Sequence, residues 1–314
     1  LGVAFPGEGI ELRNNNITIP ILILNPVLSE QIEDVIQHSL GVTVNSLDIA
    51  NEISITAKKY NRNIRIHVEI DTGMGGAGVC PDKALPFIKT LLLIENLEIE
   101  GVFTHFSSSE EKDKSFTYEQ NRIFKEVIKQ LENEKITISL IHAANSAAIL
   151  DIDDSHFNMV RPGLILYGIF PSKYVSRNIE LKQSMSFKTR IINLKELDPG
   201  SVIGYGRTFE ITKQTTVATI PVGYKDGFGR GFSNLGEVLV HGKRVPIIGR
   251  VCMDRCFIDV TDLSDVEIGS EVILLGEQDN EIISIESAAE LIGTIPYEIV
   301  CNVGTITPKK MYRQ

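Results

Sequence analysis

The chain has 314 residues, of which 43% are hydrophobic and 23% are charged, and its formal net charge is −10. This length and composition are typical of a globular enzyme or binding protein with two domains, each able to bury its own core. The acidic balance excludes nucleic acid and anionic membranes as expected partners, since both require a basic surface. A small-molecule substrate is the remaining expectation.

Cysteine usage and apolar runs predict the compartment. The four cysteines form no Cys-x-x-Cys pair, so neither a disulfide framework nor a metal site is expected. The longest apolar run, residues 19–24, contains a proline and is far too short to span a bilayer. The chain opens on no signal-peptide pattern. We therefore expect a cytoplasmic protein.

Residues 1–180 alternate between apolar, β-branched stretches and stretches of helical periodicity. This alternation is typical of parallel strands joined by helices, and its density favours a parallel (β/α)8-type barrel over an open sheet. The chain opens on Leu1-Gly2-Val3, without an initiator Met, as if within a buried strand, so we expect the barrel to lack its first βα unit. The predicted strands are 19–24, 41–45, 64–71, 98–105, 136–143 and 157–167, and the predicted helices are 29–39, 47–60, 81–95, 116–134 and 146–150.

Residues 181–314 have a different pattern, in which short strands are separated by turns, and predict a mainly β C-terminal domain. His241-Gly242 is expected to form a hairpin turn, and residues 285–292 the one clear helix. The predicted strands are 187–194, 216–222, 237–241, 244–248, 252–261, 271–275 and, last, 297–303.

Polar residues follow several successive strands of the predicted barrel. Chemistry in such barrels is carried at the carboxyl ends of the strands, so these residues are candidates for a site. Each also has a structural interpretation: Arg161 as part of an ion pair, and His105 as a satisfied core histidine. The candidates are Asp71, Thr104, His105, His142, Asn145, Ser146 and Arg161.

Two segments suit a phosphate group. Asn145-Ser146 lies where a strand turns into a helix, so a hydroxyl and unpaired amides can bind an anion there, and Gly163-Leu164 offers unobstructed amides. The alternative is a helix cap without a ligand. Residues 73–78 fit Gly-x-Gly-x-x-Gly, but the following helix is expected only from Pro81, which disfavours a dinucleotide site.

In the β domain, the apolar stretch 216–222 leads into the turn Gly223-Tyr224-Lys225-Asp226-Gly227. A tyrosine held by glycines at the end of a strand can act as a general acid or base, because its phenol both donates and accepts. The alternative is an ordinary turn tyrosine. A second turn, Arg250 to Asp254, follows about thirty residues on.

Ten motifs in order along the chain resemble those of the alanine racemases, pyridoxal-phosphate enzymes with a barrel followed by a β domain. The resemblance covers essentially the whole chain. The motifs are Leu1-Gly2-Val3-Ala4, Ile70-Asp71-Thr72-Gly73-Met74-Gly75, Thr104-His105-Phe106, His142-Ala143-Ala144-Asn145-Ser146-Ala147-Ala148, Met159-Val160-Arg161-Pro162-Gly163, Leu166-Tyr167-Gly168, Gly204-Tyr205-Gly206-Arg207-Thr208, Ile220-Pro221-Val222-Gly223-Tyr224, Gly249-Arg250-Val251-Cys252-Met253-Asp254 and Pro296-Tyr297-Glu298.

The resemblance implies a two-base racemisation. A lysine holds the cofactor and serves one face of the substrate Cα, and Tyr224 of the partner subunit serves the other. Arg161 is implied to face the pyridine nitrogen, and His105 to link Arg161 towards Tyr224. Because Met253, with Asp254, is implied to bind the substrate carboxylate from the partner subunit, a homodimer is expected. The phosphate is implied to be held by Ser146, Asn145, Gly163, Leu164 and Tyr297.

The chain departs from the family pattern at three positions. No lysine in it stands in the context of the Schiff-base lysine, which in the family precedes the Leu1 segment. Gly76 replaces an arginine that contacts the cofactor phenolate, and Glu69 replaces a lysine that pairs with that arginine. The last two changes bring into question how the cofactor is tuned.

Three interpretations of function are open. The first is an alanine racemase of which residues 1–314 are only a part, with the Schiff-base lysine in a segment that precedes Leu1. Such an enzyme supplies D-alanine for cell-wall peptidoglycan. The second is a racemase of another small amino acid, such as serine. The third is a non-catalytic relic on the same fold. In every case we expect residues 1–314 alone, without that lysine, to be inactive.

Overall fold

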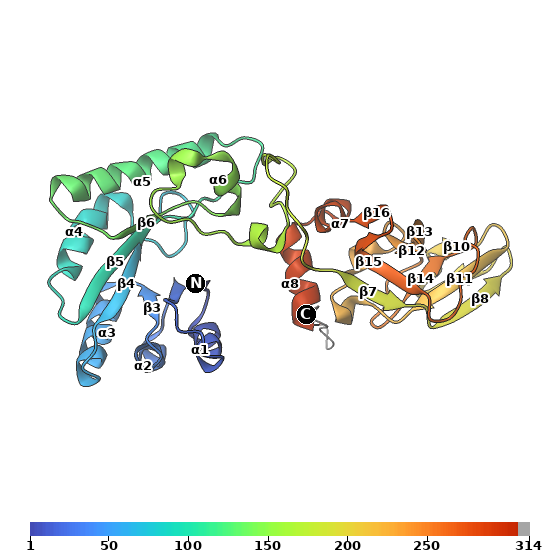
Figure 1. Ribbon diagram of the computed structural model, residues 1–314, viewed down its shortest axis with the longest axis horizontal. Coiled ribbons are helices and arrows are strands. Elements are labelled where there is room, and N and C mark those ends of the chain that lie inside the picture. The colour runs from blue at the N-terminus through green and yellow to red at the C-terminus, as the bar shows by residue number, and fades with distance from the viewer. Residues whose placement is uncertain (307–314) are drawn as a thin grey trace. The chain divides into compact units, whose positions relative to one another are not determined.

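The computed structural model describes residues 1–306, and its chain divides into two compact units (Figure 1). The first unit contains residues 1–163 and 174–176, and the second contains residues 164–173 and those from 177 onward. Residues 307–314, the end of the predicted β domain, lie outside the described residues.

The first unit is a six-stranded parallel sheet curled into a half-barrel. Its strands pair in the order of the sequence, β1 to β6, so every connection is a crossover through the helical layer. The parallel barrel-type fold expected from the strand–helix alternation is confirmed. The strands are β1 (Gly2–Val3), β2 (Leu22–Pro26), β3 (Gly41–Thr43), β4 (Ile64–Glu69), β5 (Leu97–Phe103) and β6 (Leu140–His142).

Helices cover one face of this sheet (Figure 1). Side chains alternate between the two faces along β4, and its apolar residues lie on the face that the helices cover. Ile64, Ile66 and Val68 pack there in one core with buried residues of the helices, such as Ile53 and Phe124. The helices are α1 (Pro6–Asn14), α2 (Ile32–Gln37), α3 (Leu47–Lys59), α4 (Pro81–Leu91), α5 (Ser115–Asn133) and α6 (Ser146–Asp151), with the 3-10 turns η1 (Ser29–Gln31) and η2 (Asp153–Ser155).

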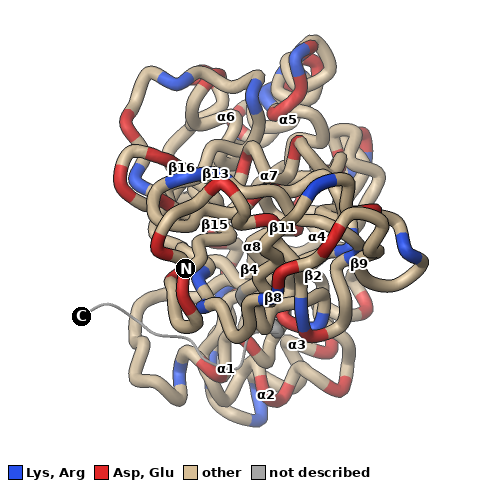
Figure 2. Tube along the Cα trace, turned by 90° about the vertical axis from the view of Figure 1, so that its right-hand side faces the viewer, with Lys and Arg blue, Asp and Glu red and all other residues tan. Residues whose placement is uncertain are grey.

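The opposite, concave face of β4 carries the intervening residues Arg65, His67 and Glu69. Barrel interiors are usually filled by branched apolar side chains, so a cation, an imidazole and a carboxylate in succession are unusual there. Acidic and basic residues elsewhere are interspersed along the chain (Figure 2). On α5, for example, Arg122 pairs with Glu119 and Glu126.

The sequence analysis was wrong about residues 157–167, which do not form a strand. Met159 makes a single bridge to His142, and the 3-10 turn η3 (Leu164–Tyr167) follows. Pro162 explains the difference, because it has no N–H to donate to a ladder and Arg161-Pro162-Gly163 therefore leaves the sheet.

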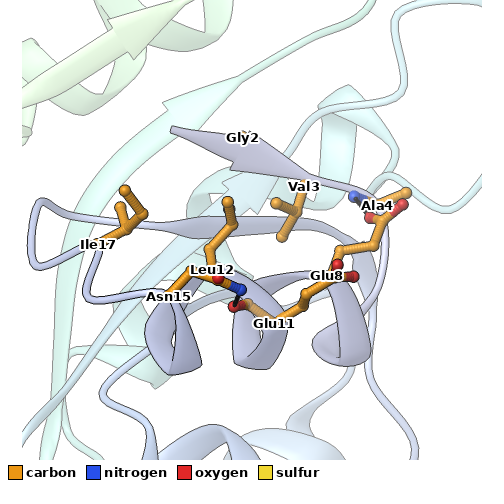
Figure 3. Close-up of a pocket in the computed structure, with 8 residues that line it drawn as sticks. All are labelled: Gly2, Val3, Ala4, Glu8, Glu11, Leu12, Asn15 and Ile17. Carbon is orange, nitrogen blue, oxygen red and sulfur yellow. Dashed lines mark hydrogen bonds between the residues drawn. The ribbon is translucent and has the colours of Figure 1, made fainter. Parts of the chain in front are cut away.

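Helix α1 was not predicted. Pro6 begins it, and the Glu8 carboxylate accepts the amides of Ala4 and Phe5 at 2.7 and 3.0 Å, which caps the helix in the absence of a capping hydroxyl. A hollow lies between β1 and α1, with Val3 and Leu12 among its lining residues (Figure 3). None of the candidate site residues lines this hollow.

The second unit is an antiparallel sheet of eight strands, with a separate two-stranded ribbon formed by β9 (Val202–Ile203) and β10 (Phe209–Glu210). The expected mainly β domain is confirmed, and so is the hairpin at His241-Gly242, where both residues have positive φ. The sheet strands are β7 (Phe187–Arg190), β8 (Asn193–Leu197), β11 (Thr215–Ile220), β12 (Glu237–Val240), β13 (Lys243–Ile248), β14 (Cys256–Asp259), β15 (Glu271–Gln278) and β16 (Glu281–Ile283).

Two helices pack with this sheet, and the second corrects the sequence analysis. Helix α7 (Ile285–Ile292) has the predicted bounds, but residues 297–303 belong to helix α8 (Pro296–Ile306) and not to a strand. Ile299 and Val303 are both buried, and a separation of four residues places them on one face of a helix. Pro296 begins the helix, where its fixed φ is favourable.

Candidate active site

The carboxyl ends of β5 and β6 converge on the Arg161 guanidinium. Its Nη1 lies 2.7 Å from Nδ1 of His142, and its Nη2 lies 3.1 Å from Nδ1 of His105. Nη2 also donates to the carbonyl oxygens of Thr104 and Ala143, each at 2.9 Å. Four contacts from two segments, the ends of β5 and β6, therefore fix the orientation of one cation.

Burial governs the charges of this cluster. Burial lowers the pKa of Arg161 to about 10, against the opposing effect of the Glu69 carboxylate, so the guanidinium stays charged at neutral pH. Burial, followed by the Arg161 charge, lowers the pKa of His105 to about 4 and that of His142 to about 2. Both imidazoles are thus neutral. Burial also raises the pKa of Glu69, although Arg161 acts in the opposite direction.

The protonation of His105 follows from these contacts. A guanidinium only donates hydrogen bonds, so Nδ1 of His105 accepts from Arg161. A neutral imidazole has one proton, which must then lie on Nε2. His105 therefore presents an N–H donor on the side away from Arg161.

The predicted phosphate residues meet at the beginning of α6. Ser146 is the first residue of this helix and is only 2% exposed. Its Oγ accepts a hydrogen bond from the Gly163 amide at 2.9 Å. The Asn145 carboxamide caps the helix by accepting from the amide of Ala148 at 3.1 Å and from Ser109 Oγ at 2.8 Å. Ser146 and Gly163 thus lie together, whereas the carboxamide oxygen of Asn145 has a structural role.

The remaining phosphate candidates lie in the second unit. Leu164 begins η3 with its side chain buried in that unit's core. Tyr297 lies in the first turn of α8, with 39% of its surface exposed.

Within the second unit, two turns dock backbone to backbone. The amides of Tyr224 and Lys225 donate to the carbonyls of Cys252 and Met253, each at 3.0 Å. Gly223 makes this possible, because a Cβ there would lie 2.2 Å from the Cys252 oxygen. Tyr224 and Met253 are therefore brought together, and their side chains remain 41% and 56% exposed.

Asp254 is the exposed neighbour of this pair. Its carboxylate accepts from Arg255 Nε at 3.1 Å, and this bond holds its pKa below the usual range. The carboxylate is thus turned towards a cation of its own chain.

The loop that carries the family departures is held by Asp71. Its carboxylate accepts the amides of Gly73 and Gly75 at 3.0 and 2.9 Å, and the next helix begins only at Pro81, as expected. A Cβ built at Gly76 meets no atom within 4 Å, so the space beside that residue is open.

Sequence reasoning missed three residues of the cluster, His67, Glu100 and Phe103. The His142 ring stacks on Phe103 with centroids 4.8 Å apart, and His67 Nδ1 lies 3.0 Å from His142 Nε2. The alternation of Arg65, His67 and Glu69 in an apolar strand was the signal that could have revealed a polar inner face.

The described part of the chain lacks both a metal-ligand cluster and a membrane-spanning helix. No group of three or more His, Cys, Asp or Glu side chains is placed there to hold a metal ion. Likewise, none of the described helices combines the length and apolarity that crossing a membrane requires.

Comparison with known proteins defines the class to which this fold and cluster belong. Residues 1–171 match the family model "Alanine racemase, N-terminal domain", and residues 184–311 match "Alanine racemase, C-terminal domain". The protein is thus an enzyme of the racemase class, with a barrel-type domain followed by a β domain.

Individual relatives agree. The alanine racemase of Halothermothrix orenii is 46% identical over 99% of this chain and 82% of its own length, and that of Methanococcus maripaludis is 43% identical over 98% and 83%. The chain belongs to the alanine racemase family, and spans about four fifths of these relatives.

Solved structures give the same result. Alanine racemase from Clostridium difficile 630 superposes with a TM-score of 0.90 at 39% identity, over 96% of this chain and 78% of that one. Alanine racemase from Bartonella henselae with covalently bound pyridoxal phosphate superposes with a TM-score of 0.85 at 28% identity, over 98% of this chain and 83% of that one.

Proposed function

We propose that the protein interconverts L-alanine and D-alanine with pyridoxal phosphate as cofactor, in the cytoplasm, and supplies D-alanine for cell-wall peptidoglycan. The observation that carries the proposal is the fixed Arg161 cation beside neutral His105.

The residues present fit the cofactor. The Ser146 hydroxyl proton and the Leu164 amide are donors suited to a phosphate, and the Gly163 amide, which donates to Ser146 Oγ, would turn to the phosphate when the cofactor binds. A Cβ at Gly163 would meet only Ser146 Oγ, at 3.6 Å, so Gly163 does not obstruct that hydroxyl. Tyr297 would complete the phosphate contacts. The chemistry that the cofactor supplies when bound is delocalisation of the electron pair left when the Cα proton departs.

Arg161 would face the pyridine nitrogen. A guanidinium has no acceptor and remains charged at neutral pH, so a ring nitrogen beside it is kept unprotonated. This restrains the electron sink and disfavours side reactions in which the carbanion persists. The four contacts on Arg161 hold it in one orientation for that purpose.

Tyr224 would move the proton at one face of the substrate Cα. Inversion needs a proton carrier on each face, since one base alone tends to return the proton to the side from which it came. The Nε2–H of His105 is the donor that would stabilise a Tyr224 phenolate. No lysine of residues 1–314 is assigned to the other face.

The substrate carboxylate would bind beside Met253, with Asp254 next to it. We propose that Tyr224 and Met253 serve the barrel of a partner subunit, so that the active form is a homodimer. The docked turns support a joint role, because two backbone hydrogen bonds fix the turn of Tyr224 against the turn of Met253.

The experiment that tests Tyr224 is its replacement by phenylalanine in the holoenzyme. We expect Tyr224→Phe to slow racemisation far more than it weakens cofactor binding. The value of kcat/KM should fall equally in both directions, because the two enantiomers have the same free energy. Tyr118→Phe, at an exposed residue of α5, is the matched control and should leave turnover and cofactor binding unchanged. A loss of turnover no larger than the loss of cofactor binding would assign Tyr224 a structural role.

Mixed dimers test the sharing of sites. Protomers with Arg161→Ala and with Tyr224→Phe, each inactive alone, should regain about one quarter of the wild-type activity after random exchange, because half of the dimers are mixed and each has one complete site. No recovery would contradict sites built from two subunits. With L-serine as substrate, slower turnover than with L-alanine is expected, and the reverse would favour a serine racemase. That residues 1–314 by themselves are inactive stays a prediction.

A further inference from the structure

A continuous row of hydrogen bonds runs along the concave face of the half-barrel to Arg161. Arg65 Nη1 donates to Glu100 Oε1 at 3.0 Å, and Glu100 Oε2 lies 3.2 Å from Nε2 of His67. His67 Nδ1 lies 3.0 Å from His142 Nε2, and His142 Nδ1 lies 2.7 Å from Arg161 Nη1. The two imidazoles are 2% and 0% exposed.

The two ends of this row fix the direction of every bond in it. Arg161 can only donate, so His142 Nδ1 accepts, and the single proton of a neutral ring lies on Nε2. His142 therefore donates to Nδ1 of His67, whose own proton lies on Nε2 and is donated to Glu100, a carboxylate that can only accept. Burial lowers the pKa of both histidines, which keeps the rings neutral.

The packing shows that both rings have a built position. A Cβ at Gly101 would lie 2.3 Å from His67 Nδ1, so the glycine provides the space into which that imidazole fits. The His142 ring is parallel to Phe103 within 9°. If either ring left the row, a buried donor or acceptor would lose its hydrogen-bond partner, and leaving such a group unpaired is costly in free energy.

We propose that Glu100 and His67 are positioning residues that hold His142 in its Nε2-protonated tautomer, so that the Nδ1 lone pair fixes the Arg161 guanidinium. Neither residue touches the reacting atoms. The half-buried Glu100 lies in the middle of β5, while Arg161 lies at the carboxyl ends of the strands, so the row connects the middle of the sheet to the candidate site. Its consequence for catalysis rests on the proposed function.

Glu100→Gln is the informative variant. A glutamine has one oxygen for two donors, and the cationic Arg65 is the stronger partner for that oxygen. The NH2 group would then face His67 Nε2, which can no longer donate and must place its proton on Nδ1, against the donor of His142. Glu98→Gln, on the same strand but exposed, is the matched control.

Long-range proton–nitrogen NMR of histidine-labelled protein reads the tautomers directly. In the wild type and in Glu98→Gln we expect His67 and His142 to show the Nε2-protonated pattern throughout roughly pH 5 to 8, the range in which an ordinary histidine changes charge. In Glu100→Gln an Nδ1-protonated form of His67 should appear. A wild-type His142 protonated on Nδ1, a cationic ring in that range, or a Glu100→Gln pattern equal to the control would overturn the proposal.

Kinetics of the holoenzyme separate this proposal from the proposed function. Glu100→Gln should lower kcat for alanine racemisation several-fold, with Glu98→Gln unchanged. An unchanged kcat in Glu100→Gln would refute the positioning role even if the tautomer shifts. A wild-type protein that shows the expected tautomers but no racemisation would refute the proposed function and leave the hydrogen-bond row intact.

Discussion

Replacement of Gly223 with alanine is expected to separate the two turns that carry Tyr224 and Met253. The new Cβ would lie 2.2 Å from the Cys252 oxygen and 2.5 Å from the carbonyl carbon of Met253. Both contacts are with backbone atoms, so no side-chain rotation can relieve them. The turns must move apart and lose the two amide–carbonyl bonds that join them.

The expected loss of stability follows from these contacts. Overpacking costs about 1–3 kcal/mol, and each lost hydrogen bond about 0.5–1.5 kcal/mol. The free energy of unfolding should therefore fall by about 2–6 kcal/mol, as measured by urea denaturation. Racemase turnover should fall in parallel, because Tyr224 and Met253 are displaced together.

Gly229→Ala, six residues further along the same segment, is the control. Its φ of −61° suits any residue, and a Cβ there meets no atom within 4 Å. Alanine at such a position is expected to stabilise by about 0.4–1 kcal/mol, because it restricts the unfolded chain. If Gly223→Ala lay within about 0.5 kcal/mol of this control, the docking of the two turns would not have the importance assigned here.

Three further outcomes are expected. Gly101→Ala should lower the melting temperature and disturb the NMR signals of His67, since its Cβ would lie 2.3 Å from that ring, whereas Gly7→Ala in α1, with open space around it, should not. The nearly buried pair of Lys114 and Asp151 should stabilise the fold above about pH 4 and lose that contribution as the pH falls. The reason is that, against the effect of burial, hydrogen bonds from Ser176 and Lys114 lower the pKa of Asp151. Lys114→Met should abolish this part of the acid dependence of stability. With a thiol reagent at pH 8, exposed Cys80 and Cys301 should react in the native protein. Cys256, whose pKa is raised by burial, should react only on unfolding, and rapid labelling of Cys256 would contradict its buried position.

The parallel sheet was predictable because its strands are continuous apolar runs bounded by turns. The sequence analysis assigned the wrong element where a single residue, or the spacing of buried residues, matters more than the strand propensity of the segment. Pro162 takes an apolar segment out of the sheet, and the four-residue separation of Ile299 and Val303 makes a helix of a segment whose residues favour strands. Helix α1 was missed because its cap is a glutamate, Glu8, within the first turn, instead of a hydroxyl before the helix.

The polar cluster was only partly predictable, for a physical reason. His105 follows a strand, Arg161 was expected to follow one, and both carry groups that suggest chemistry, so each could be singled out alone. Glu100, His67 and His142 acquire their meaning only from pairing across strands, between residues 33 and 75 positions apart. The tautomers of the two histidines are set by Arg161 and Glu100 at the ends of the row, and no short stretch of sequence contains both ends.

The measurement that tests the central claim most directly is the chiral analysis of alanine incubated with the native protein and pyridoxal phosphate. The account predicts that L-alanine and D-alanine each convert to the same mixture, at rates well above those of the free cofactor, and that Arg161→Ala suppresses both. If each enantiomer were recovered unchanged from the cofactor-loaded protein, the assignment of this cluster to racemisation would be wrong.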